Sequence, residues 1–554
     1  MRKHALIWLS GRMRRRIPAI ILMTVFQAGH ALFGVFFALG SRGVIDAAVS
    51  GAADQFLQAC IRQACIIAVI LLCLTAVRHL QERLRADLEK DWKQQLLHGL
   101  LYGEYSAVSE YHSAEILNRL NSDVGKVNDG VVTIIPSAAA MITKLIAAVT
   151  VLGILDARFT LAVVILGGLV ILATGMMRSR LKELNKQVGE HDGKVSGFLQ
   201  ETVEKLLMVQ AMDVAGEVER RTDILLDDRY EIQRKRRNVS LFANTCVSLM
   251  SYGAGFLALC WCSARLLRGE MSFGSLTAVI QLVNQIQTPF VNLSGVFPKY
   301  IAMVASAERL MELDGIQGEP EPMQDDPRQI YRRMQMLHAE NLSFSYDRDE
   351  VLKDADFFLP KGAFAIITGP SGIGKSTLLK LMLGVFKPAE GELSICCDDG
   401  KILLDRSTRR LFAYVPQGNL LLSGTIRENL TIVRPDAAEE EIRQAVHVSA
   451  MDEFLPQLPC GLDTVIGESG AGLSEGQAQR LAIARAVLGG APILLLDECT
   501  SALDAQTERT VLHRLKELQG RTCIAVTHRK AAIELCDWRM EVGGGKIRVV
   551  PNHQ

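Results

Sequence analysis

The fold of this chain can be inferred first from the stretch Gly369-Pro370-Ser371-Gly372-Ile373-Gly374-Lys375-Ser376-Thr377. The apolar run before it, residues 363–368, has the composition of a buried strand, and residues 378–384 after it read as a helix closed by glycine. Three glycines let the backbone curve so that its N–H groups point at phosphate oxygens: Gly369, Gly372 and Gly374. The new helix adds the positive end of its dipole, Lys375 can reach the terminal phosphates, and the Ser376 hydroxyl can ligate Mg²⁺. The stretch therefore predicts a phosphate-binding loop rather than a chance glycine turn.

The rest of the composition divides the chain into unlike halves. At 554 residues it is too long for one hydrophobic core, so two or more domains are expected. Lys+Arg and Asp+Glu both number 61, a balance that gives no sign of nucleic-acid binding. Hydrophobic residues make up 49% of the sequence, and much of that content precedes residue 300. The first half therefore has the composition of a membrane protein.

Six apolar segments predict a helical transmembrane domain over residues 1–313, with spans at about 17–40, 60–77, 131–155, 159–177, 239–267 and 275–296. The basic start, Met1–Arg16, predicts a cytoplasmic N-terminus. The long, charged connections 78–129 and 178–238 are rich in Lys and Arg, as cytoplasmic loops are, and their helical patterning predicts helices that continue past the bilayer. Six spans return the chain to the cytoplasm, so we expect a multi-pass protein of the cell membrane.

A connector rich in Gly, Pro and acids, residues 314–333, separates this part from an α/β domain predicted over residues 334–554. The 12 cysteines do not suggest a disulfide framework, since six lie in or beside predicted spans and none has paired metal-ligand spacing.

Two further runs in the second half end in chemically active residues. Residues 493–496 predict a buried parallel strand that ends in Asp497 and Glu498, and acids at such a strand end face the nucleotide crevice. Asp497 is expected to hold Mg²⁺ and Glu498 to polarise the attacking water. A second run, residues 522–527, ends in His528, which could contact the γ-phosphate. A histidine alone would more often be structural, but its position at a strand end favours the functional interpretation.

A second helix N-terminus suited to phosphate follows Leu473-Ser474-Glu475-Gly476-Gln477. Ser474 is a good N-cap for the strong helical pattern over residues 478–486. One triphosphate rarely needs two such termini from one chain, whereas two chains that face each other could use both.

These motifs together resemble those of ATP-binding cassette (ABC) transporters, of the exporter type in which a half-transporter fuses a membrane domain and an ATPase domain. The resemblance covers essentially the whole chain and implies a membrane α-helical domain followed by an α/β P-loop NTPase domain. Residues 369–377 match the Walker A motif, Asp497 and Glu498 match Walker B and its catalytic acid, and His528 matches the switch histidine. The other matching positions are the adenine-stacking Tyr346, the magnesium-sensing and catalytic Gln417, the signature motif Leu473–Gln477, the D-loop Ser501, Ala502, Leu503 and Asp504, and residues 111–120 around the first coupling helix.

Two positions depart from the family pattern. Glu475 stands in the signature motif where glycine is usual, and its charge suits a helix N-terminus. Residues 467–470 resemble the cross-linking loop but carry Ser469 where arginine is usual.

The resemblance implies alternating access in a dimer that sandwiches two ATP molecules with Mg²⁺, each between the Walker motifs of one chain and the signature motif of the other. The second half-transporter could be identical or different, since both a homodimer and a heterodimer remain open. We expect ATP-driven export of a small molecule, peptide or lipid, with importer or lipid flippase on the same fold as the alternative. A regulatory ATPase without transport is disfavoured because both Glu498 and His528 are present.

One polar face in the sixth predicted span is a candidate substrate cavity. Its amides and hydroxyl recur at steps of three and four residues: Gln281, Asn284, Gln285, Thr288 and Asn292. They could line the cavity or bond between packed helices, and the two interpretations are equally supported. Lys144, within the third span, could extend toward the interface, pair with a carboxylate or mark a binding site. We predict a cavity lined by Lys144, Gln281, Asn284, Gln285 and Thr288.

Overall fold

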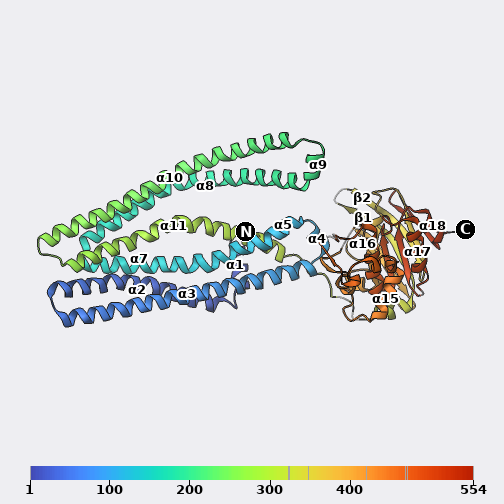
Figure 1. Cartoon of the computed structure of the whole chain (residues 1–554), viewed down its shortest axis with the longest axis horizontal. Helices are drawn as coiled ribbons and strands as arrows, with labels where there is room; N and C mark the ends of the chain where they lie inside the picture. The colour runs from blue at the N-terminus through green and yellow to red at the C-terminus, as the bar shows by residue number, and fades with distance from the viewer. Residues whose placement is uncertain are drawn as a thin grey trace. The chain divides into compact units, whose positions relative to one another are not determined.

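The computed structural model describes residues 2–321, 323, 325–346, 349–418, 421–467, 470, 472–518 and 520–552 (Figure 1). It divides into two compact units. The first joins Met1–His98 to His112–Gly315, and the second joins Gly99–Tyr111 to Ile316–Gln554. The chain therefore passes between the units three times, because residues 99–111 fold with the second unit although they precede most of the first.

The first unit is built of helices and short π-helical turns. The helices are α1 (Arg2–Arg12), α2 (Ile17–Ser50), α3 (Ala53–Tyr102), α5 (Ser113–Asn118), α6 (Val124–Asp129), α7 (Ile135–Leu155), α8 (Ala157–Glu204), α9 (Leu206–Ala211), α10 (Ala215–Leu267) and α11 (Phe273–Asp314). The π-helical turns are η1 (Arg119–Asp123) and η2 (Gly130–Ile134). Figure 1 shows α8 and α10 side by side and joined through α9, so the long connection 178–238 is helical, as the sequence predicts.

Four described helical segments are long and apolar enough to cross a membrane: Ile17–Ser50, Ala53–Tyr102, Ser113–Leu155 and Ala215–Leu267. The other two predicted spans, residues 159–177 and 275–296, fall in α8 and α11. Side chains at positions 166, 169–178, 290–295 and 297 lie outside the described part of these two helices. The count of six spans therefore stays a prediction.

Helix α11 runs antiparallel to α2. At its start, the Asp46 carboxylate of α2 accepts hydrogen bonds from the Gly274 N–H (2.9 Å) and the Ser272 hydroxyl (2.9 Å). Further along, Gln285 donates to the Gly34 carbonyl at 2.8 Å. The direction is antiparallel because the α2 partner moves back along the sequence as α11 advances. A buried apolar cluster then packs these helices with α7, α8 and α10: it includes Val35, Ala148, Val163, Ala258 and Leu282.

A buried carboxylate ties η1 to the last part of α11. Asp123 is fully buried, and it accepts hydrogen bonds from the Ser306 hydroxyl (2.9 Å) and twice from the Arg309 guanidinium (2.6 and 2.7 Å). Lys126 lies at 3.6 Å from the same carboxylate, beyond hydrogen-bond distance. The ion pair with Arg309 therefore stabilises this junction more than the one with Lys126, because only Arg309 adds two short, charge-assisted hydrogen bonds to the Coulomb attraction.

The second unit contains a six-stranded sheet in the order β12-β11-β3-β10-β9-β6 and an antiparallel four-stranded sheet in the order β2-β1-β4-β5. The six strands are β3 (Phe364–Thr368), β6 (Phe412–Val415), β9 (Ile493–Asp497), β10 (Thr522–Val526), β11 (Trp538–Gly543) and β12 (Lys546–Pro551). The four are β1 (Met334–Tyr346), β2 (Asp349–Pro360), β4 (Glu390–Cys397) and β5 (Gly400–Leu403). A short pair, β7 (Gly424–Thr425) and β8 (Val465–Ile466), is antiparallel.

Helices flank these sheets: α4 (Tyr105–Ser109), α12 (Pro327–Arg333), α13 (Lys375–Met382), α14 (Ile426–Thr431), α15 (Glu439–Val448), α16 (Glu475–Leu488), α17 (Ala505–Lys516) and α18 (Lys530–Leu535). All neighbouring pairs among β11, β3, β10, β9 and β6 are parallel. Both faces of this sheet are covered: along β9, Leu494 and Leu496 enter one apolar cluster, while Ile493 and Leu495 enter the other. Burial on both faces explains why the strand sequences are continuous apolar runs.

Residues 99–111 are an integral part of the second unit. Gly103 bridges to Gly318, the Tyr105 ring meets Phe386 edge-on at 6.0 Å, and Glu104 pairs with Lys387 at 2.9 Å. Helix α4 therefore belongs to the second unit, and it lies directly before the stretch 111–120 that resembles the coupling region.

The Asp123 junction predicts a stability difference between two variants. Asp123→Asn removes the negative charge to which Arg309 and Ser306 donate hydrogen bonds. It should lower the free energy of unfolding of the first unit by about 2 kcal/mol. Lys126→Gln should change it little, because that lysine lies 3.6 Å from the carboxylate, too far for a hydrogen bond. Thermal unfolding followed by tryptophan fluorescence suits the measurement, since Trp8, Trp92 and Trp261 lie in the first unit. Equal losses in both variants would contradict the assignment.

Candidate functional site

The phosphate-binding loop joins β3 to α13 through backbone that only glycine adopts easily. Gly369, Gly372 and Gly374 have φ angles of +151°, +78° and +107°. A Cβ added at Gly369 would come within 2.4 Å of the Val542 carbonyl oxygen, and one at Gly374 within 2.3 Å of a Val351 methyl. Any larger residue at these two positions would therefore distort the loop.

The Lys375 ammonium lies inside this loop. Its side chain is buried and donates to the carbonyls of Gly369 (2.9 Å) and Pro370 (2.8 Å). The positive charge is thereby held inside the loop, which suits it to bind the terminal phosphates of a nucleotide.

A buried carboxylate faces the start of α13. Asp497, the last residue of β9, is 2% exposed, and one of its oxygens accepts from the Tyr414 hydroxyl at 3.3 Å. Its other oxygen, Oδ1, is buried without a partner among the described residues. Burial raises the pKa of Asp497, a shift that the neighbouring Ser376 and Tyr414 hydroxyls oppose and the charge of Glu498 increases. An unpaired carboxylate oxygen beside a serine hydroxyl fits the oxygen ligands that Mg²⁺ takes in such sites.

Glu498 follows Asp497 in a conformation that non-glycine residues rarely adopt. Its φ is +49°, and its N–H donates to the Val526 carbonyl of β10 at 3.0 Å. The Gln417 amide donates to the Glu498 carboxylate at 2.7 Å. The structure thus brings two of the predicted catalytic residues together. The third, His528, is exposed, and its imidazole forms no hydrogen bond within the part of the chain that the structure describes.

Tyr346 presents an aromatic ring near the same loop. The side chain is 41% exposed, and its hydroxyl lies 3.3 Å from the Thr377 Oγ1. Phe344 and Phe386 meet the ring edge-on, at 5.0 and 5.5 Å. These contacts fix the ring's orientation and leave part of it free to stack on a base.

The signature segment caps α16 as its sequence predicts. The Ser474 hydroxyl accepts from the Gln477 N–H at 3.3 Å, and the Gln477 side chain accepts from the Ser474 N–H at 2.9 Å. Glu475 is exposed, which allows its charge to remain solvated. Gly476 must be small, because a Cβ there would lie 2.9 Å from the Ala502 carbonyl of the D-loop. In the cross-linking loop, Glu468 and Ser469 lie outside the described residues.

Two residues that the sequence analysis missed bind the D-loop. Buried Gln479, on α16, donates to the Ser501 hydroxyl and accepts from the Ala502 N–H, both at 3.1 Å. Arg529, next to His528, donates to the Ser501 carbonyl and, at 2.8 Å, to the Leu503 carbonyl. The D-loop is therefore held from the signature helix on one side and from the switch histidine's neighbour on the other.

The acids around this clamp have structural partners. Arg529 also pairs with Glu508 at 3.3 Å, and buried Glu508 accepts from the Thr500 hydroxyl at 2.9 Å. Asp504 accepts from the N–H groups of Thr507 and Gln506 at the start of α17, and the bond from Thr507 is the main reason why the pKa of Asp504 is lowered. No local pattern in the sequence distinguishes Arg529, since its partners lie 21 to 28 residues earlier.

The predicted cavity residues of α11 differ in their surroundings. Gln285 bonds to Gly34 through its nitrogen, while its oxygen is buried without a partner in the described structure. Thr288 donates within its own helix, to the Asn284 carbonyl at 2.9 Å. Asn284 is exposed, whereas Gln281 is half-buried, as is Lys144 on α7. The Asn292 side chain lies outside the described residues. The polar face therefore serves partly as a contact between helices, through Gln285.

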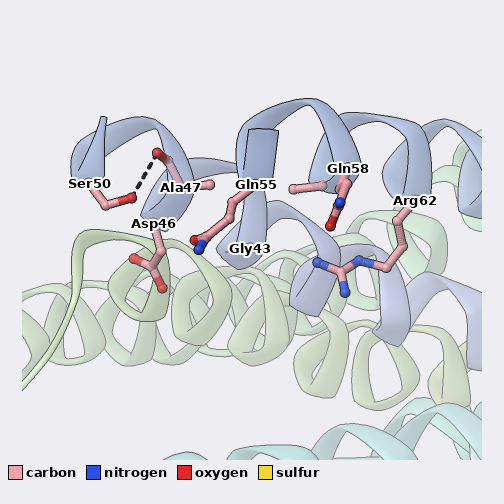
Figure 2. Close-up of a pocket in the computed structure, with 8 residues that line it drawn as sticks. Gly43, Asp46, Ala47, Ser50, Gln55, Gln58 and Arg62 are labelled. Atoms are coloured by element: carbon pink, nitrogen blue, oxygen red, sulfur yellow. Dashed lines mark hydrogen bonds between the residues drawn. The ribbon is translucent and has the colours of Figure 1, made fainter. Parts of the chain in front are cut away.

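A separate polar cavity of about 520 Å³ lies where α2 ends and α3 begins (Figure 2). It is lined by Gly43, Asp46, Ala47, Ser50, Gln55, Gln58, Ala59 and Arg62. Its one carboxylate, Asp46, is already bonded to the first turn of α11. The cavity is therefore a polar gap beside a helix cap.

A parallel sheet with this loop and these acids, fused to long apolar helices, defines a P-loop ATPase joined to a membrane domain. The family models agree in detail: the ABC transporter transmembrane region matches residues 20–290, and the ABC transporter model matches residues 352–501. The chain belongs to the ABC transporters and carries their membrane and ATPase parts in one polypeptide, as the sequence predicts.

Individual ABC transporters are also similar to this chain in sequence and in structure. The uncharacterized ABC transporter ATP-binding protein YwjA of Bacillus subtilis is 34% identical over 391 residues, which cover 68% of this chain and 65% of that protein, slightly less than two thirds. The ATP-dependent lipid A-core flippase of Chromobacterium violaceum is 29% identical over 483 residues, 85% of this chain and 81% of the flippase. A solved structure of a bacterial Atm1-family ABC exporter with ATP bound has a TM-score of 0.80 and 23% identity, and covers 98% of this chain and 95% of its own. This likeness confirms the predicted fold.

Tyr346 and Lys375 should fail differently when they are replaced. Lys375→Ala removes the charge from the phosphate loop and should abolish ATP hydrolysis. Tyr346→Ala removes only stacking on adenine, about 1–3 kcal/mol by analogy with base–aromatic contacts, and should chiefly raise the KM for ATP. Tyr346→Phe keeps the ring and serves as the control. If both alanine variants lose maximal rate equally at saturating ATP, the adenine role of Tyr346 is wrong.

The hydrogen bonds from Arg529 to the D-loop carbonyls predict that replacing this residue lowers kcat but not the stability of the protein. Arg529→Lys keeps a cation for Glu508 but cannot reach both D-loop carbonyls, so kcat should fall about tenfold, or about 1.4 kcal/mol. The melting temperature should stay close to that of the wild type. Arg443→Lys, whose arginine pairs with the exposed Glu440 on α15, is the matched control. An unchanged kcat in Arg529→Lys would show that the D-loop needs no such clamp.

Proposed function

We propose that this chain is an ATP-driven exporter that works in the cell membrane as one half of a dimer. The proposal rests chiefly on one observation: the left-handed Glu498 is bonded to Gln417 and stands directly after the buried Asp497, at the edge where the phosphate loop begins. A nucleotide-binding protein that did not hydrolyse ATP would not need this carboxylate. Family membership supports the coupling of that hydrolysis to transport.

Each residue then has a chemical role. Lys375 binds the terminal phosphates together with the N–H groups of the loop, and Tyr346 stacks on the adenine. Ser376 and Asp497, with Gln417, would hold Mg²⁺, which neutralises phosphate charge when it is bound. Glu498 accepts hydrogen bonding from the attacking water and polarises it, and His528 orients the γ-phosphate. The bond from Gln417 keeps the Glu498 carboxylate in position before ATP arrives.

The second chain completes each ATP site. Ser474 and its neighbours place the N-terminus of α16, a helix of 14 residues, at an exposed position suited to phosphate. We propose that this terminus binds the ATP held by the Walker motifs of a second half-transporter, identical or different. The first unit then crosses the membrane with its N-terminus and the ATPase unit in the cytoplasm.

A lipid is one candidate for the transported molecule. The similarity to a lipid A-core flippase over 85% of this chain favours flipping as a second candidate function on the same fold. Inverted membrane vesicles separate the possibilities, since an exporter accumulates its substrate inside them when ATP is added, and a flippase changes the leaflet in which a labelled lipid is found.

Glu498→Gln tests the proposed hydrolysis. The variant should bind ATP, hydrolyse it at least about a hundredfold more slowly, and accumulate as a closed dimer that size-exclusion chromatography can detect. Glu541→Gln, an acid on β11 that pairs only at the surface, should turn over normally. Near-normal ATPase activity in Glu498→Gln would remove the basis for the assigned catalytic acid.

A further inference from the structure

Lys144 stands near the middle of a membrane-spanning helix. It is half-buried within the 21 residues of α7, and the outer end of that helix at Leu155 is about 16 Å away along the axis. A lysine side chain is too short to carry its ammonium over that distance to water or lipid head groups. The charge must therefore be stabilised at this depth.

This chain supplies no carboxylate for that purpose. Helix α7 contains neither Asp nor Glu, and the predicted spans 60–77, 159–177 and 239–267 contain none either. The one acid of α2, Asp46, lies about 24 Å along the helix from His30 and caps α11. On α11 the acids begin only at Glu308. An identical partner chain would have the same shortage.

A second basic side chain lies on α2, the helix that packs against α7. His30 is half-buried, as Lys144 is, and its imidazole lies within range of the Lys144 charge. Beyond this pair, one turn further along each helix, Ala148 and Gly34 lead into the apolar cluster that packs α7 against α2. Burial disfavours a charge on either base, and an anion that lies near both would stabilise their protonated forms.

Gln285 adds an unused acceptor next to the same place. Its amide nitrogen is bonded to the Gly34 carbonyl, one turn from His30, while its Oε1 is buried without a partner in the described residues. A buried acceptor is costly to leave unpaired, so a hydrogen-bond donor is expected there.

We infer that Lys144, His30 and Gln285 bind an organic anion, in which a carboxylate or phosphate faces the two bases and an N–H or O–H group donates to Gln285. The inference rests on the proposed function, because this anion would be the transported molecule. Charge-assisted hydrogen bonds from Lys144 and His30 stabilise the oxyanion, and the ligand supplies the counter-ion that the helices lack.

Thr288 is the position from which this charge can be measured. It is exposed and lies one turn after Gln285, and since α11 is antiparallel to α2, that is the side on which His30 lies. The full-length Thr288→Cys protein, freed of its native cysteines, is placed in phosphatidylcholine nanodiscs. Its thiol is then modified by two methanethiosulfonate reagents of similar size, the anionic sulfonatoethyl and the cationic trimethylammonioethyl compounds.

Relative to a free thiol in water, the cysteine should prefer the anionic reagent. Lys144→Gln should reduce this preference by about threefold to tenfold, as expected for one unit charge at short range in a partly aqueous site. Lys144→Arg should retain it. Lys182→Gln, an exposed lysine of α8 beyond the predicted span, is the matched control and should have no effect. A preference that does not change in Lys144→Gln, or a thiol that reacts with neither reagent, would overturn the anion site.

Protection of the same thiol identifies the source of the anion. Phosphatidylglycerol added to the nanodiscs should slow modification if the site takes a lipid head group, and soluble glycerol 3-phosphate should slow it if the site takes a free organic anion. Protection by neither would contradict an oxyanion site. ATP hydrolysis is measured on the same protein. If the Thr288→Cys protein with Lys144 intact shows normal ATPase activity but no anion preference, this inference alone is overturned and ATP-driven export stands.

Discussion

The catalytic arrangement depends on parallel hydrogen bonding between strands that are buried on both faces. In this register Val526 of β10 pairs with Ile367 of β3 and with Asp497 of β9, and Val415 of β6 pairs with Leu496. The carboxyl ends of four strands therefore stop at one edge of the sheet. The residues that follow these strands therefore lie together at that edge: the phosphate loop, Glu498, His528 and Gln417. Their own contacts are not needed to form the fold. Burial of the apolar strands stabilises the sheet, and the candidate nucleotide site lies at the carboxyl ends of those strands.

The sequence was sufficient for those parts of the site that lie next to a strand end or helix start. The glycines before Lys375 and the acids after residue 496 are recognisable because their chemistry and their secondary structure are adjacent in the chain. The Arg529–Ser501 and Gln479–Ala502 contacts could not be predicted, since they depend on how α16, the D-loop and β10 come together. The positive φ of Glu498 was equally hidden, because a glutamate carries no local signal for it.

The membrane half was less predictable for a physical reason. Hydropathy and charge located the apolar segments and the helical extension from α8 to α10, but they do not say which side of a helix meets its neighbour. The amide face of α11 shows the difficulty. One side chain, Gln285, bonds between helices through its nitrogen, while its oxygen has no partner among the residues that the structure describes. Periodicity predicts which face of the helix such a residue occupies. It does not predict that one polar atom bonds to a neighbouring helix while the other stays available to a ligand.

Residues 99–111 give the ATPase unit a discontinuous chain. The segment covers Phe386 with the Tyr105 ring, and it offers the Tyr102 carbonyl to the Arg406 guanidinium at 2.9 Å. A fragment that began at residue 316 would keep every nucleotide-binding motif, yet it would leave this aromatic and this arginine without their covering. The boundary of the folding unit is therefore different from the boundary of the sequence motifs, and α3 enters the ATPase unit as a piece of its own tertiary structure.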